Sequence, residues 1–275
     1  MKVIHRYNVE YSKSLEEKLI EFNVSFKRKY IEGLMDNIVF ELKQGSSQEK
    51  ELSPFIDIDI LNCLTYVEYS KKELDDSLFL IMRPKLQNIE IINRDESLKS
   101  VCSEIDKFNI VRTYHLEQTD EFKVKYSLKN TTYLYSIDTG FSYIFANQKF
   151  YEVVNKHEIK GINFKHVSTK KEKVCSEFYQ VESSNIIKFT DINTEKHCKV
   201  RECKICKKKS IVVDELFQLK LNLGKEELEE DFYMTEQIFG EGIPERYYII
   251  SQKLYKLLVE EHMDKNVAFI PIILK

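Results

Sequence analysis

Two stretches of this 275-residue chain resemble each other, and this similarity limits the possible folds more than any other feature. Residues 143–167 read YIFANQKFYEVVNKHEIKGINFKHV, and residues 248–272 read YIISQKLYKLLVEEHMDKNVAFIPI. In the middle of each stretch apolar residues recur at i, i+3 and i+4, as on one face of a helix, and β-prone residues flank that part. The period of about 104 residues is too long for a solenoid. We therefore predict a duplicated strand–helix–strand module.

The alignment of the two stretches predicts matching positions. Asn147 and Ser251 precede the two helical parts, and both residue types are favoured at helix N-caps. With one gap, Phe164 aligns with Phe269. The expected buried faces are Phe150, Val153 and Val154 in one helix, and Leu254, Leu257 and Leu258 in the other.

The fold class that these patterns predict is α+β, with short-stranded, mostly antiparallel sheets and a few helices. We expect three regions, residues 1–80, 81–170 and 171–275, of which the last two each carry one copy of the module. The first region opens with a strand and a helix, for which Ser14 and Glu17 form a capping-box pattern. Because the chain has only 7 glycines and 4 prolines, long structureless linkers are not expected.

Charge and hydropathy narrow the functional class. The formal net charge is -3, whereas non-specific nucleic-acid binders usually carry a basic excess. No run approaches the ~18 apolar residues of a membrane span, and the first residues lack the apolar segment of a signal peptide. The 6 cysteines are therefore expected to be reduced thiols or metal ligands. We expect a cytoplasmic protein that does not act at a membrane.

The stretch HCKVRECKICKKKS, residues 197–210, looks most like a chemical site. Cys203 and Cys206 have the C-x2-C spacing with which a tight turn presents two thiolates to one zinc ion. Cys198 is the candidate third ligand, and His197 or Cys175 the candidate fourth. Because no cysteine follows Cys206, a plant-type iron–sulfur cluster is excluded. A structural zinc site and a hairpin with unligated thiols both remain open, and a redox role is the weaker alternative.

Two further patterns suggest an enzyme as an alternative. Asp57 and Asp59 lie two apart on an expected strand, so both carboxylates could bind one divalent cation. Asp36, Glu41 and Lys43 form a short version of a nuclease D…E-x-K arrangement. These residues would serve a metal-dependent nuclease. A second alternative is a zinc-containing nucleic-acid-binding module built on residues 197–210, against which the net charge argues.

The end of the chain resembles a known family. The ending IFGEGIPERYYIISQKLYKLLVEEHMDKNVAFIPI is similar to the C-terminal module of immunity proteins from bacterial polymorphic-toxin systems. Ile238-Phe239 matches an apolar pair before that module, and Phe178-Tyr179-Gln180-Val181 matches a strand in the middle of the family pattern. The resemblance covers about residues 140–275. A related branch carries two CxxCG knuckles, whereas this chain has one CxxC, followed by Lys207 instead of glycine.

The resemblance implies a non-enzymatic protein that binds and neutralises one cognate toxin domain by occluding it. The partner would be a protein, and no cofactor beyond one possible structural zinc is implied. An acidic run, EELEED, could steer the encounter with a cationic toxin, although a solvated face is the simpler interpretation. The candidate partner-binding residues in this run are Glu226, Glu227, Glu229, Glu230 and Asp231.

Overall fold

The chain forms two compact units, Met1–Glu73 and Leu74–Lys275. The computed structural model describes residues 1–30, 36–56, 63–84, 90–105, 111–125, 133–136, 143–169, 174–189, 198–213, 220–221, 228–240 and 245–274. Helices and many short strands, mostly antiparallel, make this a mixed α+β protein, as predicted. No helix in these ranges is both long and apolar enough to cross a membrane.

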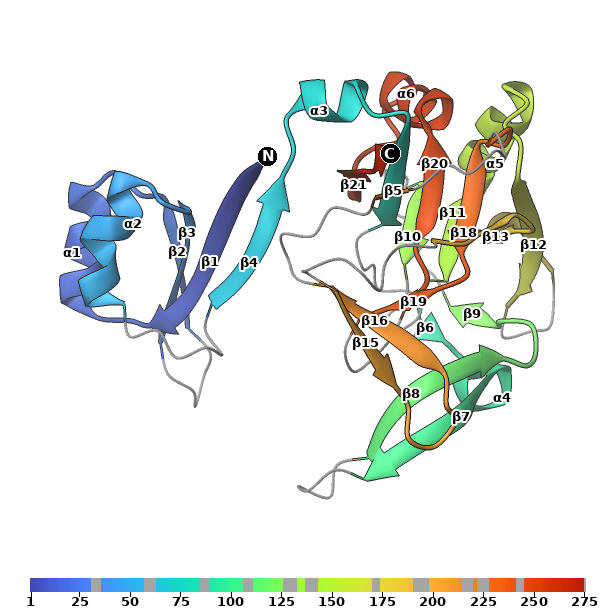
Figure 1. The fold of residues 1–275 in the computed structure, drawn as a ribbon, viewed down its shortest axis with the longest axis horizontal. Helices are drawn as coiled ribbons and strands as arrows, with labels where there is room; N and C mark the ends of the chain where they lie inside the picture. Colours follow the sequence, from blue (N-terminus) through green and yellow to red (C-terminus); the bar gives the residue numbers. More distant parts are fainter. Residues whose placement is uncertain are drawn as a thin grey trace. The chain divides into compact units, whose positions relative to one another are not determined.

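The first unit has the strand order of a ferredoxin-like fold. Its elements are β1 (Lys2–Glu10), α1 (Lys13–Glu21), β2 (Phe26–Lys29), β3 (Asn37–Lys43), α2 (Ser47–Leu52), the 3-10 turn η1 (Ser53–Phe55) and β4 (Cys63–Glu68). The sheet order is β2-β3-β1-β4, and all neighbouring strands are antiparallel. This βαββαβ succession with its split connections is the ferredoxin-like arrangement. Figure 1 shows α1 and α2 on one face of the sheet.

The core of the first unit lies between that sheet face and the helices. Tyr7 of β1 and Phe40 of β3 stack with ring centroids 5.1 Å apart, and α1 buries Leu15 and Leu19 against them. The predicted capping box at Ser14 is wrong, because α1 begins at Lys13. Ser12 is its N-cap and accepts a hydrogen bond from the N–H of Leu15 at 3.2 Å.

The second unit contains two successive sets of elements. The first set is α3 (Lys71–Asp75), β5 (Phe79–Pro84), β6 (Glu90–Ile91), α4 (Arg94–Ser97), β7 (Leu98–Ile105), β8 (Val111–Gln118), β9 (Val124–Lys125), β10 (Leu134–Ser136), β11 (Ile144–Asn147), α5 (Gln148–Lys156) and β12 (Ile162–Ser168). The second set is β13 (Val174–Ser183), β14 (Ile186–Ile187), β15 (Cys198–Glu202), β16 (Lys209–Val213), β17 (Lys220–Leu221), β18 (Phe232–Thr235), β19 (Ile238–Phe239), β20 (Tyr248–Ser251), α6 (Gln252–Glu260), β21 (Val267–Pro271) and β22 (Ile273–Leu274).

The two sets share one topology, and each completes the other's sheet. One sheet has the order β10-β11-β13-β12; the other contains β18-β20-β5-β21 and adds β14 beyond β18. In the first sheet, β13 of the second set lies between β11 and β12, the strands that flank α5. In the other sheet, β5 of the first set lies between β20 and β21, the strands that flank α6. We call β5 to β12 the first repeat and β13 to β21 the second repeat. The two repeats exchange their middle strands, β5 and β13.

The pairing register supports the predicted alignment in detail. Val181 of β13 is paired with Ile144 on one side and Phe164 on the other. Met82 of β5 is likewise paired with Tyr248 and Phe269. Phe164 and Phe269, aligned in the sequence with one gap, therefore occupy the same place in the two sheets.

Both predicted helix caps are confirmed. Asn147 accepts a hydrogen bond from the N–H of Phe150 at 3.0 Å, and Ser251 accepts one from Leu254 at 3.2 Å. The predicted apolar faces are buried, and residues of both helices and of both exchanged strands belong to one core cluster. Because the repeats share strands and a core, residues 74–275 are one unit rather than two.

Candidate functional site

The cysteine-bearing stretch forms a hairpin. Strands β15 and β16 pair antiparallel, from Cys198 opposite Val213 to Glu202 opposite Lys209. The turn between them is closed by two backbone hydrogen bonds of 2.9 Å, from the N–H of Cys203 to the carbonyl of Lys208 and from the N–H of Lys207 to the carbonyl of Cys203. Cys203 and Cys206 therefore lie together in one tight turn at the tip of the hairpin.

Lys207 explains how this turn closes without glycine. Its φ is 59°, in the left-handed region that glycine adopts at little cost and other residues seldom visit. A conformation of this kind costs about 1–2 kcal/mol for a non-glycine residue.

The other predicted zinc ligands are not brought to the turn. Cys198 lies at the opposite end of β15, about 16 Å from Cys203 at the usual strand rise, and packs against a core cluster. Cys175 is buried in a different cluster, opposite Val167 in its sheet. His197 is outside the described residues. Among the side chains that the structure describes, no three His, Cys, Asp or Glu are grouped as a metal ion requires.

The base of the hairpin stands on an aromatic cluster. Strand β16 pairs in parallel with β19, with Ile211 opposite Phe239. Phe239 stacks on Tyr247 with ring centroids 4.3 Å apart, and the guanidinium of Arg83 lies 5.5 Å from the Tyr247 ring. Burial raises the pKa of Tyr247 to about 12, despite the opposing effect of Arg83. This partly buried phenol packs, together with Phe239, beside the hairpin.

The described residues of the acidic run, 228–231, differ in exposure. Glu226 and Glu227 lie outside the described residues, and Glu229 is exposed. Glu230 is partly buried, and its N–H donates to the hydroxyl of Tyr233 at 2.7 Å. Of the candidate partner-binding residues within the described ranges, Glu229 therefore has the most accessible side chain.

Asp231 instead joins the two repeats. Asp231 is only 8% exposed. Its carboxylate accepts hydrogen bonds from Ser251 Oγ at 2.6 Å and from the N–H of Lys160 at 3.1 Å. Lys253 Nζ lies 3.4 Å away. Lys160 precedes β12 in the first repeat, and Ser251 caps α6 in the second. Asp231 is thus engaged in structural contacts within the molecule.

Of the described nuclease-like residues of the first unit, Asp36 is separated from Glu41 and Lys43. Asp36 forms an ion pair with Arg28, in which Nη2 and Oδ2 are 2.6 Å apart, at the end of β3 remote from Lys43. Glu41 and Lys43 share the sheet face opposite the helices, because residues two apart on a strand point the same way. Asp57 and Asp59 lie outside the described residues.

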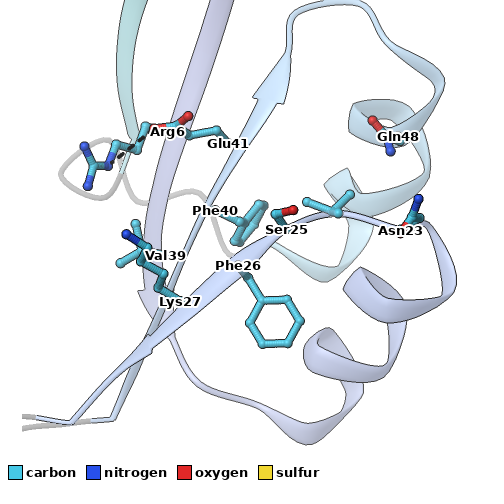
Figure 2. A pocket seen from close by; sticks show the side chains of 10 residues that line it. Arg6, Asn23, Ser25, Phe26, Lys27, Val39, Phe40, Glu41 and Gln48 are labelled. Carbon is cyan, nitrogen blue, oxygen red and sulfur yellow. Dashed lines mark ion pairs between the residues drawn. The ribbon is translucent and has the colours of Figure 1, made fainter.

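A pocket of about 490 Å³ lies beside Glu41, where the chain leaves α1 and enters β2 (Figure 2). Arg6 and Lys27 line it together with polar groups of the α1–β2 connection and of α2. Glu41 Oε1 lies 3.9 Å from Arg6 Nε and partly neutralises it. The pocket is therefore polar and mixed in charge, and its described residues do not reproduce the predicted D…E-x-K set.

The sequence did not indicate a polar cluster on the helix-facing side of this sheet. His5 Nδ1 lies 2.5 Å from Glu49 Oε1, and the hydroxyl of Tyr7 lies 3.5 Å from the same oxygen. The other oxygen of Glu49 accepts from the N–H of Gly45 at 2.6 Å. Burial, with Cys63 and Glu49 next in effect, raises the pKa of Tyr7 to about 12. Glu49 thereby ties α2 to β1. Because Glu49 and His5 are 44 positions apart in the sequence, no local pattern indicated their contact.

Both units thus have recognisable topologies, one ferredoxin-like and one internally duplicated. Comparison of the chain with models of protein families, with curated proteins and with solved structures found no match. Ferredoxin-like topology serves many unrelated activities, so it assigns no function by itself.

Proposed function

We propose that this chain is a cytoplasmic immunity protein that binds one cognate bacterial toxin domain and neutralises it by occlusion. The observation that carries the proposal is the resemblance of about residues 140–275, including the ending at residues 238–272, to the immunity proteins of polymorphic-toxin systems. In this interpretation the protein performs no chemistry on the toxin. It inhibits by covering the surface through which the toxin reaches its substrate.

The apolar positions of the resemblance are scaffold positions. Ile250, Leu254 and Leu258 are fully buried in the shared core of the repeats. The family pattern therefore describes how the module folds, and the toxin-binding surface must consist of other, exposed residues. Such surfaces gain affinity from a few well-packed anchors and gain association rate from peripheral charges.

The proposal predicts that a toxin domain is encoded next to this chain, and the test is to co-express the two. We expect the full chain to restore growth and to co-purify with the toxin domain as a stable complex. Continued toxicity at full expression of the chain, together with the absence of a complex by size-exclusion chromatography, would contradict the proposal.

A charge-reversal pair tests whether the acidic run takes part. Glu229→Lys should slow association with a cationic toxin at low salt, because steering charges act mainly on the association rate. Glu260→Lys is the matched control, since Glu260 is also exposed but lies at the end of α6. Equal association rates for both variants and the wild type would remove the acidic run from the interface and leave the proposed function standing.

A further inference from the structure

The most cationic stretch of the chain is the β15–β16 hairpin. Residues 199–209 contain six basic residues and one acidic residue, which give them a formal charge of +5. The formal net charge of the whole chain is -3, so the other residues together carry -8. The hairpin is therefore a local cationic surface on an otherwise acidic chain.

The structure exposes these charges around the turn of the hairpin. Lys204, Lys207 and Lys209 are exposed, and Ile205, in the middle of the turn, is 52% exposed. We call these four residues the cationic tip. None of its three lysines forms an ion pair within the part of the chain that the structure describes. The tip thus presents unneutralised charge beside one exposed apolar side chain.

The turn is fixed by its own backbone and by a contact with β8. Two backbone hydrogen bonds of 2.9 Å between Cys203 and the segment 207–208 close it. Lys208 forms an ion pair with Glu117 near the end of β8, and Figure 1 shows the turn beside the β7–β8 hairpin. A surface that is ordered before it binds loses little conformational freedom on binding. The tip is therefore preorganised for docking.

Two features of the tip oppose the stability of the unbound chain. The like charges of its lysines repel one another. Lys207 also has a φ of 59°, a left-handed conformation that glycine would adopt with less strain. Backbone strain that the surrounding structure maintains is concentrated at functional sites, where it contributes to preorganisation. Together the two features indicate a surface that meets an acidic partner.

The chemistry of the tip favours a protein as that partner. Residues 197–210 contain no aromatic residue on which a base could stack, whereas proteins that bind single-stranded nucleic acids combine cations with aromatic side chains. The charge of -8 on the other residues would repel a polyanion. Ile205 alone offers little apolar surface for insertion into a membrane. An exposed isoleucine among cations fits instead an acidic protein surface that contains a small apolar pocket.

We propose that the cationic tip docks on an acidic patch of the toxin domain, with Ile205 entering an apolar pocket inside that patch. This inference rests on the proposed function and deepens it, because it gives the charge of the toxin surface that the protein covers. An apolar anchor surrounded by peripheral charges is a common arrangement at protein interfaces. The anchor contributes affinity, and the charges contribute association rate and partner selection.

The first test measures association of the full chain with the immobilised toxin domain by surface plasmon resonance. The double variant Lys204→Glu, Lys209→Glu should lower the association rate constant about tenfold at low salt, because electrostatic steering raises such rates by at least about that factor. The difference should shrink at high salt, where exposed charges are screened. The matched control is Lys156→Glu with Lys256→Glu, which changes the net charge equally at exposed positions of α5 and α6. The control should associate faster than the tip variant.

The second test concerns the apolar anchor. Ile205→Ala should raise the dissociation rate constant at least about fivefold, as expected for a side chain at the centre of an interface, and should leave the association rate nearly unchanged. Ile20→Ala is the matched control, because Ile20 is 65% exposed but belongs to α1 of the other unit. The control should dissociate at the wild-type rate.

A third measurement separates a protein partner from other anionic partners. The wild-type chain is titrated with a labelled single-stranded oligonucleotide and with vesicles of phosphatidylserine and phosphatidylcholine at physiological salt. We expect it to bind neither. Binding to either probe that the double tip variant loses would overturn the assignment of a protein partner.

The outcomes distinguish this inference from the proposed function. If the wild type binds the toxin domain and the tip variants, shown by circular dichroism to be folded, keep wild-type rate constants, the docking role of the tip is overturned and the proposed function stands. If the wild type forms no complex with the toxin domain, both are overturned.

Discussion

Gly161 of the first repeat packs closely against β18 of the second repeat, and replacing it with alanine should weaken the second unit strongly. Its φ is 86°, and a Cβ built on it would lie 2.4 Å from the carbonyl oxygen of Phe232 and 2.8 Å from Nδ2 of Asn185. The carbonyl belongs to the backbone of β18, which cannot move without disturbing its pairing with β20. Beside it, the N–H of Asp231 donates to the carbonyl of Lys160 at 3.2 Å, which fixes the distance between the two segments.

Two effects add in the Gly161→Ala variant. The left-handed backbone costs about 1–2 kcal/mol for alanine, and forced overpacking of a well-packed site costs about 1–3 kcal/mol. We expect the free energy of unfolding of the second unit to fall by about 3 kcal/mol, within the summed range of about 2–5 kcal/mol. For a unit of this size, a loss of about 3 kcal/mol lowers Tm by about 6–12 °C.

The assay is denaturant unfolding of the full chain followed by circular dichroism, with the transition of each unit assigned first. Gly45→Ala is the control, because Gly45 also has a positive φ, of 73°, but no atom lies within 4 Å of its added Cβ. It should cost only the backbone contribution of about 1–2 kcal/mol. If Gly161→Ala destabilises its unit no more than Gly45→Ala does, the close packing of the repeats against Gly161 is refuted.

Two other predictions follow from the same repeats. Asn147→Ala should destabilise the second unit by about 1 kcal/mol, because it removes a helix N-cap. Ser251→Ala should destabilise it more, because Ser251 Oγ also donates to the buried carboxylate of Asp231; no effect from either variant in calorimetry would contradict the cap assignment. The pKa of Tyr247 is near 12 in the folded chain and ordinarily near 10. Because folding favours the neutral phenol, Tyr247 contributes its full stabilisation below pH 10, and that contribution is lost as the pH rises toward 12. Tyr247→Phe should keep the stacking on Phe239 and reduce the loss of stability over that interval, measured by denaturant midpoints at several pH values; an unchanged pH profile would contradict the assignment.

Local patterns were sufficient wherever the determining contacts are close in sequence. The caps at Asn147 and Ser251 depend on the amide three residues ahead, and the buried faces of α5 and α6 depend on a helical period. The capping box at Ser14 failed within the same range, because Ser12 offered a competing cap that the helix uses. Even the equivalence of Phe164 and Phe269 was visible, since duplication preserves order along the chain.

The candidate site was predictable only in part. Cys203 and Cys206 were found because their spacing is itself the signal for a turn with two thiols. Cys198 was grouped with them by nearness in the sequence. In an extended strand, however, each step along the chain covers about 3.3 Å. The five steps from Cys198 to Cys203 therefore place Cys198 about 16 Å from the tip. Glu49 and His5 belong to a helix and a strand that only folding brings together.

By itself the sequence determined the α+β class, the two strand–helix–strand modules, their caps and their apolar faces, because hydrogen bonding and amphipathicity over a few residues suffice for each. Tertiary structure alone decided that β5 and β13 are exchanged between the repeats. A strand pairs through backbone groups that every residue carries, so its sequence does not name its neighbours; burial in the shared core selects them. The same long-range pairing decided which residues meet the cysteine turn.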